Sequence, residues 1–146
     1  MSETWIQTAL GRMRSESGRS GGARRVVVEF IGGRDCCVSA QEIHDAVRAA
    51  GARIGIASVY RTVDRLDELG LVQRVDLGDG VSRVERADPR GDHHHHLVCG
   101  DCGKVEPFED TALEQAIAGI AGGRGYEVAA HDVVLRGACG DCRPAD

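Results

Sequence analysis

Four of the six cysteines form two C-x-x-C pairs in the C-terminal half of the chain, with 36 residues between the pairs. Structural disulfides are rare in a reducing cytoplasm, whereas paired C-x-x-C elements supply four thiolates to tetrahedral zinc, with bonds of about 2.3 Å. A thioredoxin-like redox pair is the alternative, but that motif is single and lies in a βαβ unit that the flanking sequence does not show. We therefore predict a structural zinc site at Cys99, Cys102, Cys139 and Cys142.

Four consecutive histidines, His93 to His96, run directly into Leu97-Val98-Cys99. Because side chains alternate along an extended strand, His93 and His95 would lie on one face and His94 and His96 on the other. Imidazole is a good ligand for zinc, iron and nickel. One short strand could therefore serve two metal sites, each completed by donors from elsewhere in the chain.

A third group of residues could bind nucleic acid. The segment 58–69 has an apolar stripe at helical spacing, and the opposite face carries Ser58, Arg61, Thr62 and Arg65, with Tyr60 alongside. Arginine can bond both acceptors of guanine or hold a phosphate, and a tyrosine ring can pack on thymine methyl groups. A solvated surface is the alternative, because several acidic residues lie nearby.

Other elements of the N-terminal half would position this helix. Apolar spacing predicts helices over residues 4–14 and 23–31, and a capping box from Ser39 to Glu42 begins a third helix that ends at Gly51. After the 58–69 helix and Gly70, strands at 71–76 and 81–86 flank a turn-forming loop, which predicts a β-hairpin. This order is typical of a winged helix-turn-helix, in which the helix before the wing enters the major groove.

The C-terminal half reads as a small α/β domain. Residues 87–92 contain Pro89 and Gly91 and predict a linker, and strands are expected at 95–99, 105–108 and 128–137 with a helix at 111–121. The predicted fold class is α+β. The winged-helix domain covers 1–86, and the second domain, with the metal ligands, covers 93–146.

Charge and hydropathy indicate where the protein is located and which partners it could bind. No apolar run approaches the roughly 18 residues of a membrane span, and the start of the chain lacks a basic segment followed by an apolar one, so we expect a cytoplasmic protein with no membrane partner. Residues 1–86 hold 13 basic and 12 acidic residues, whereas residues 87–146 hold 5 and 11. The net charge of −5 does not exclude DNA, because a binder needs only a local basic face.

Taken together, these motifs resemble the ferric uptake regulator family over nearly the whole chain, from about Ala23 to Cys142. The residues that carry the resemblance are Ala57-Ser58-Val59-Tyr60-Arg61 before the hairpin, and Asp92-His93-His94-His95-His96-Leu97-Val98-Cys99-Gly100-Asp101-Cys102-Gly103-Lys104-Val105 after the linker. The resemblance implies a homodimeric repressor that binds palindromic AT-rich operators in double-stranded DNA when its sensing metal is loaded. It implies no small-molecule substrate.

The resemblance also assigns residues to sites. Tyr60 and Arg61 would contact bases, and the four cysteines of the C-x-x-C pairs would hold the zinc that orders the dimerisation domain. A sensing site between the two domains would use Glu85, His94, His96 and Cys37. A second site within the dimerisation domain would use His93, His95, Glu114 and His131.

The sensed metal is left open by one departure from the family pattern. Iron sensors of the family usually have histidine where this chain has Cys37. A thiolate beside two imidazoles and a carboxylate favours Zn(II) over Fe(II), which stays the alternative. Cys37 could instead be a small buried residue, as free cysteines often are. Peroxide sensing by metal-catalysed oxidation is a further variant within the family.

The sequence also bears on two other functional classes, a zinc-binding module without DNA binding and a zinc enzyme. A zinc-binding storage or protein-interaction module would lack the steep salt dependence that DNA binding through arginine and lysine produces. An enzyme with zinc-activated water needs an open coordination position beside a general base. Four thiolates leave no such position and no nucleophile–base pair is evident, so we expect no enzymatic activity.

Overall fold

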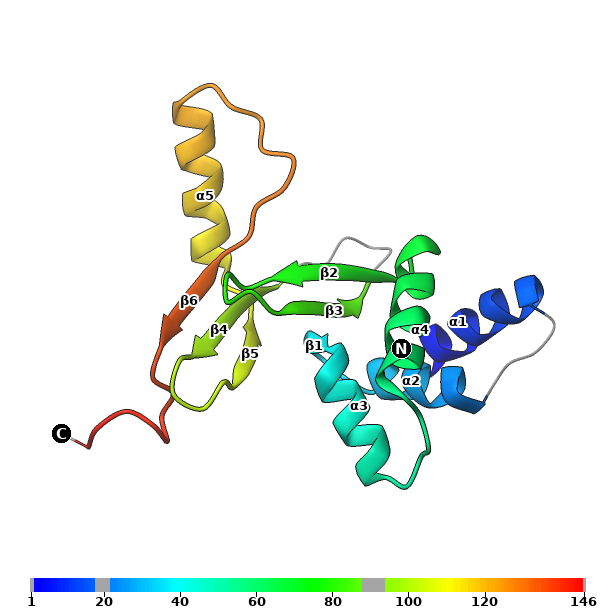
Figure 1. The fold of residues 1–146 in the computed structure, drawn as a ribbon. Coiled ribbons are helices and arrows are strands. Elements are labelled where there is room, and N and C mark those ends of the chain that lie inside the picture. Colours follow the sequence, from blue (N-terminus) through cyan, green and yellow to red (C-terminus); the bar gives the residue numbers. More distant parts are fainter. Residues whose placement is uncertain (1, 18–21, 88–93, 146) are drawn as a thin grey trace. The chain divides into compact units, whose positions relative to one another are not determined.

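The computed structural model describes residues 2–17, 22–87 and 94–145, and the chain divides into two compact units, residues 1–91 and 92–146 (Figure 1). The predicted linker of residues 87–92 lies, apart from Ala87, outside the described residues. Among the helices of the described residues, none is long and apolar enough to cross a membrane.

The first unit is a winged helix-turn-helix, as the sequence predicts. Its three strands form one antiparallel sheet in the order β1-β3-β2, and the β2–β3 hairpin is the wing. In chain order its elements are α1 (Ser2–Ser17), α2 (Gly22–Gly32), β1 (Val38–Ser39), α3 (Ala40–Ala49), α4 (Ile56–Glu68), β2 (Val72–Asp76) and β3 (Ser82–Arg86).

The core of this unit is aliphatic and joins all four helices to the sheet. Val27, Ile31, Ile43 and Leu66 are almost completely buried, and they come from α2, α3 and α4. Trp5 of α1 packs on this cluster, and its indole N–H donates to the carbonyl of Leu71 at 2.9 Å. The recognition helix candidate α4 is therefore held by the core of the unit.

Local signals set the ends of the two central helices. At the start of α3 the Ser39 hydroxyl accepts from the backbone N–H of Glu42 at 3.1 Å, and the Glu42 carboxylate accepts from the backbone N–H of Ser39 at 2.7 Å, which is the predicted capping box. Gly70 follows α4 with φ of +67°, a conformation that favours glycine. The helix α4 begins two residues earlier than predicted, at Ile56.

Close packing of α1 on α2 gives a first stability prediction. A Cβ added at Gly32 would lie 2.3 Å from Ile6 Cγ1, so Gly32→Ala is expected to lower the free energy of unfolding by about 1–3 kcal/mol through overpacking. Gly11, on α1, has open space around its Cβ position, so Gly11→Ala is expected to stabilise by up to about 1 kcal/mol. Urea denaturation of both variants measures the difference, and an equal response of the two would contradict this packing.

The second unit is a three-stranded sheet with one helix. Strand β4 is central, antiparallel to β5 and parallel to β6, and α5 lies between β5 and β6 in the chain. The predicted strand at 128–137 pairs only over its last four residues, because the preceding segment forms no ladder. The elements are β4 (His95–Cys99), β5 (Val105–Phe108), α5 (Thr111–Gly123) and β6 (Val134–Gly137).

Candidate metal centres and nucleic-acid interface

The four cysteines of the C-x-x-C pairs meet at one end of the β4–β6 pair. Because β6 runs parallel to β4 with Gly137 opposite Cys99, the two motifs leave the sheet at the same end. All four sulfurs lie within 4.8 Å of one another, and those of Cys102 and Cys139 are 3.8 Å apart. Four sulfurs bonded to one tetrahedral zinc would lie about 3.8 Å apart. The donor set and its spacing therefore fit a structural zinc ion.

Tight turns and backbone N–H groups shape this cluster. The backbone N–H groups of Cys102 and Cys139 point at the Cys99 sulfur and lower its pKa to about 6, and the Cys139 N–H lies 3.3 Å from it. Hydrogen bonds from the Cys142 thiol to Cys139, and then to Cys102, raise the pKa of Cys142 to about 12. Four adjacent sulfurs cannot all ionise unless a cation compensates their charge, which a divalent metal would do.

A second cluster of metal-ligand types lies in the same unit, where α5 begins. The carboxylate of Glu114 bridges two rings, with Oε1 2.6 Å from His95 Nε2 and Oε2 2.9 Å from His131 Nε2. The other ring nitrogen of His95, Nδ1, accepts from the backbone N–H of Val133 at 3.3 Å, so Nε2 is the nitrogen that faces Glu114. A cavity of about 180 Å³ opens on His95 and Glu114. The structure thus brings together three predicted ligands, and His93 lies outside the described residues.

The remaining predicted ligands fall in two groups, one in each unit. In the first unit, Glu85 on β3 accepts a hydrogen bond from Gln73 Nε2 on β2 at 2.6 Å, which orients its carboxylate. In the second unit, the rings of His94 and His96 lie edge to face with centroids 4.9 Å apart.

The two adjacent cysteines of the first unit differ in their surroundings. The sulfur of Cys36 lies within 4.8 Å of a Glu85 carboxylate oxygen. Cys37 is buried, its sulfur is 3.9 Å from that of Cys36, and a hydrogen bond to Cys36, burial and the nearby Glu85 carboxylate raise its pKa above the usual range. Sequence reasoning named Cys37 as a candidate ligand and did not consider Cys36, although its position beside Cys37 could have drawn attention to it.

The exposed side of α4 carries part of the predicted DNA-binding set. Tyr60 is 52% exposed, and Arg61 is exposed with its guanidinium donating to the Ser58 hydroxyl at 3.0 Å. Arg65 is half-buried and forms an ion pair with Glu68 one turn away. Thr62 was expected on this exposed face but is buried, because its hydroxyl turns back and donates to the Ser58 carbonyl at 2.8 Å.

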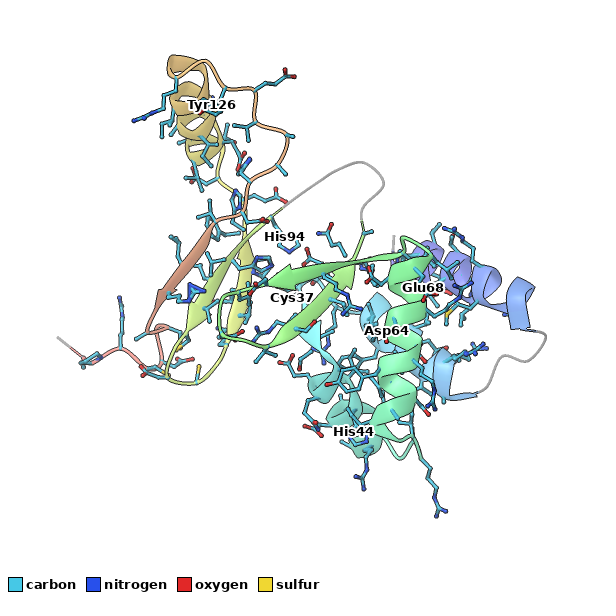
Figure 2. All side chains as sticks on the ribbon, turned by 45° about the horizontal axis from the view of Figure 1, so that its top comes forward. Cys37, His44, Asp64, Glu68, His94 and Tyr126 are labelled. Atoms are coloured by element: carbon cyan, nitrogen blue, oxygen red, sulfur yellow. The ribbon has the colours of Figure 1, made fainter. Side chains whose placement is uncertain are left out.

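Two of the three acidic residues of α4, Asp64 and Asp67, are paired with the wing. Arg74 of β2 donates to Asp67 at 2.7 Å and to Asp64 at 2.8 Å, and these hydrogen bonds raise the pKa of its guanidinium. Figure 2 labels Asp64 and Glu68 along the helix. Arg74 thus links α4 to the wing through Asp64 and Asp67.

The wing loop is ordered by a second arginine–carboxylate pair. Arg83 Nη2 lies 2.8 Å from Asp79 Oδ2, and the backbone N–H of Val81 donates to Asp79 Oδ1 at 3.1 Å. The hydrogen bonds from Arg83, and then Val81, lower the pKa of Asp79 to about 2. Asp79 is therefore ionised at neutral pH, and its carboxylate joins Arg83 of β3 to the backbone of the loop.

Comparison with known proteins agrees with this arrangement. Residues 16–136 match the model of the ferric uptake regulator family. The chain is 38% identical over 108 residues to the ferric uptake regulation protein of Escherichia coli K12, covering 73% of this chain and 72% of that protein. It is 35% identical over 106 residues to the protein of the same name from Bordetella parapertussis, covering 73% and 75%.

The fold comparison points the same way. The crystal structure of the Vibrio cholerae ferric uptake regulator superposes with a TM-score of 0.73 at 31% identity, over 88% of this chain and 98% of that one. The sequence match includes the recognition helix, the wing, the histidine run and the first C-x-x-C pair, all of which lie within residues 16–136. The chain therefore belongs to the ferric uptake regulator family of metal-responsive, DNA-binding transcriptional regulators.

Proposed function

We propose that this protein is a zinc-responsive repressor that binds palindromic, AT-rich operators as a homodimer. The observation that carries the proposal is the pairing of functions on one chain: a winged helix with an exposed Tyr60–Arg61 pair in one unit, and clusters of metal-ligand side chains in the other. A storage module would have no use for the first unit.

DNA binding would use the exposed start of α4. Tyr60 and Arg61 lie in its first turns, where a recognition helix meets base edges in the major groove. Ser58 holds the Arg61 guanidinium on this side, and Arg65, one turn further on, would reach a phosphate on leaving Glu68. The Arg74 contacts would set how the wing follows the DNA backbone.

Dimerisation would use the second unit. In the part of the chain that the structure describes, α5 has no buried residue, although its sequence is mostly Ala, Leu and Ile. Ile120 is 63% exposed, and Tyr126, labelled beyond the end of α5 in Figure 2, is 74% exposed. Such apolar surface on a small unit needs a cover, and a second copy of the chain supplies the matching face.

Metal would act at three places in this account. A structural zinc would occupy the four-cysteine cluster, and His95, Glu114 and His131, with His93, would form a second site. The regulatory site would draw Glu85 and a cysteine thiolate from the first unit and His94 and His96 from the second. This mixture of sulfur, nitrogen and oxygen favours Zn(II), a borderline-soft ion, over Fe(II).

The regulatory metal would work by fixing one arrangement of the two units. A metal that binds that arrangement more tightly shifts the population towards it. Only a dimer whose two α4 helices have the right separation can engage both half-sites, and simultaneous engagement supplies avidity. Repression would then follow the zinc supply.

Replacing the two histidines of the second unit tests the proposal. The variant His94→Ala/His96→Ala is expected to lose zinc-dependent operator binding, measured by fluorescence anisotropy, because two of the four regulatory ligands are gone. Its sedimentation as a dimer and its retained zinc at the four cysteines are the internal controls. Zinc-dependent binding equal to that of the wild type would contradict the proposed regulatory site.

A further inference from the structure

Either of two adjacent cysteines of the first unit, Cys36 or Cys37, could supply the thiolate of the proposed regulatory site. Position-by-position likeness to the family points to Cys37, yet neither the family nor the C-x-x-C pattern says anything of Cys36. The backbone around the pair and the location of each sulfur distinguish the two.

The local backbone explains how a cysteine other than the expected one comes to lie beside Glu85. The β1–β3 ladder pairs Val38 with Val84 and Ser39 with Arg83, so its continuation would place Cys37 opposite Glu85. The strand, however, begins only at Val38, and the chain bends at Asp35 and Cys36. Cys37 therefore precedes the β1–β3 ladder, and its position is not set by strand pairing with Glu85.

The sulfur positions follow from that bend. The Cys36 sulfur lies within 4.8 Å of a Glu85 carboxylate oxygen and is partly exposed, as a ligand that exchanges metal with solvent must be. Cys37 is only 7% exposed and has its sulfur 3.9 Å from that of Cys36. Buried cysteines of this kind behave as small apolar residues.

We propose that Cys36, together with Glu85, is the donor pair that the DNA-binding unit contributes to the regulatory zinc site, and that Cys37 is a packing residue beneath it. One sulfur at about 2.3 Å and one oxygen at about 2.0–2.2 Å from a single zinc ion would lie closer together than 4.8 Å, so only a small movement of the side chains is required. The hydrogen bond from Gln73 already orients the Glu85 carboxylate, as partners outside the coordination sphere of metal sites commonly do.

This inference rests on the proposed regulatory site, and cobalt spectroscopy can test it on the full-length dimer. The four-cysteine site is first filled with zinc, and Co(II) is then titrated in anaerobically while the thiolate-to-cobalt charge-transfer band in the near ultraviolet is followed. Cys36→Ser and Cys37→Ser form a matched pair, and Cys37→Ala is added because a hydroxyl group at a buried position can disturb folding.

The expected result is that Cys36→Ser loses the charge-transfer band and binds regulatory zinc about 100-fold or more weakly, since loss of an outer partner alone costs about 10- to 100-fold. Cys37→Ser or Cys37→Ala should keep both the band and the affinity. The inference is overturned if Cys36→Ser keeps the band, or if the Cys37 variants lose it while remaining folded.

The His94→Ala/His96→Ala variant distinguishes failure of the Cys36 assignment from failure of the proposed regulatory site. If it perturbs the cobalt spectrum while Cys36→Ser does not, the regulatory site stands and only the assignment of Cys36 fails. If neither variant alters Co(II) binding, the proposed regulatory site fails and Cys36 fails with it.

Discussion

Replacing Cys102 and Cys139 by serine is expected to remove the zinc of the four-cysteine site almost entirely, from about one ion per chain to nearly none. Structural zinc binds with an apparent free energy of about 10–16 kcal/mol, and where the site forms only on folding this energy stabilises the fold. The second unit has three short strands and a helix with no buried residue among its described residues, so little else holds it together. Its order should therefore be lost with the metal.

Plasma mass spectrometry of the purified protein gives the zinc content, and hydrogen–deuterium exchange gives the order of each unit. Exchange should increase across residues 94–145 but not across the first unit, whose aliphatic core is its own. The matched control is Asp101→Asn, an exposed residue between two of the cysteines, which should keep its zinc. A double-serine variant with native exchange in the second unit would show that the zinc is not structural.

Substitution of Arg61 by alanine is the second large effect that we expect. Loss of a bidentate contact to guanine costs about 1–3 kcal/mol, so operator affinity should fall roughly 5- to 150-fold. Tyr60→Ala should weaken binding at the position where its ring meets a thymine methyl. Both effects should be confined to the operator, with little change for a scrambled duplex at the same salt concentration.

Lys104→Ala is the control, because it also removes one positive charge. Lys104 lies in the second unit, not on α4, and is paired with Glu106 at 3.2 Å. It should leave operator affinity and its salt dependence close to those of the wild type. Equal losses for Arg61→Ala and Lys104→Ala, or for operator and scrambled duplex, would mean that α4 does not read sequence.

Most elements of the fold could be predicted because their signals are local. The capping box at Ser39, the glycine after α4 and the apolar stripes are all readable within a few residues. Strand β1 escaped prediction because two residues carry no periodicity, and it exists only through pairing with β3. Thr62 was misplaced because a back-bonded hydroxyl can be buried on a helix face that looks polar.

The candidate sites could be predicted where the spacing of ligand-type residues along the sequence indicates a metal site. Two C-x-x-C pairs predict a four-cysteine cluster almost unaided, and the structure brings all four sulfurs together. The contact between His131 and Glu114 depends on the path of the segment after α5, and no pattern in the sequence predicts that path. The proximity of the Cys36 sulfur to Glu85 follows a backbone bend before a two-residue strand, which the spacing of residues does not predict.

The structure also explains how a chain with a net charge of −5 can bind DNA. Asp64 and Asp67 of α4 share Arg74, whose single positive charge offsets one of their two negative charges. Asp79 in the wing is likewise paired with Arg83. The acidic excess of the chain falls in residues 87–146, whereas the residues that would meet phosphate belong to the first unit.

Titration of the metal-depleted, full-length protein with zinc and, separately, with ferrous iron tests the central claim most directly. Binding to a palindromic AT-rich duplex is followed anaerobically, after the tightly held zinc per chain has been measured. The account predicts that about one zinc ion per chain stays bound through purification and that further zinc, but not iron, switches on DNA binding. Activation by ferrous iron alone would contradict zinc sensing, and DNA binding that ignores both metals would contradict the regulatory mechanism itself.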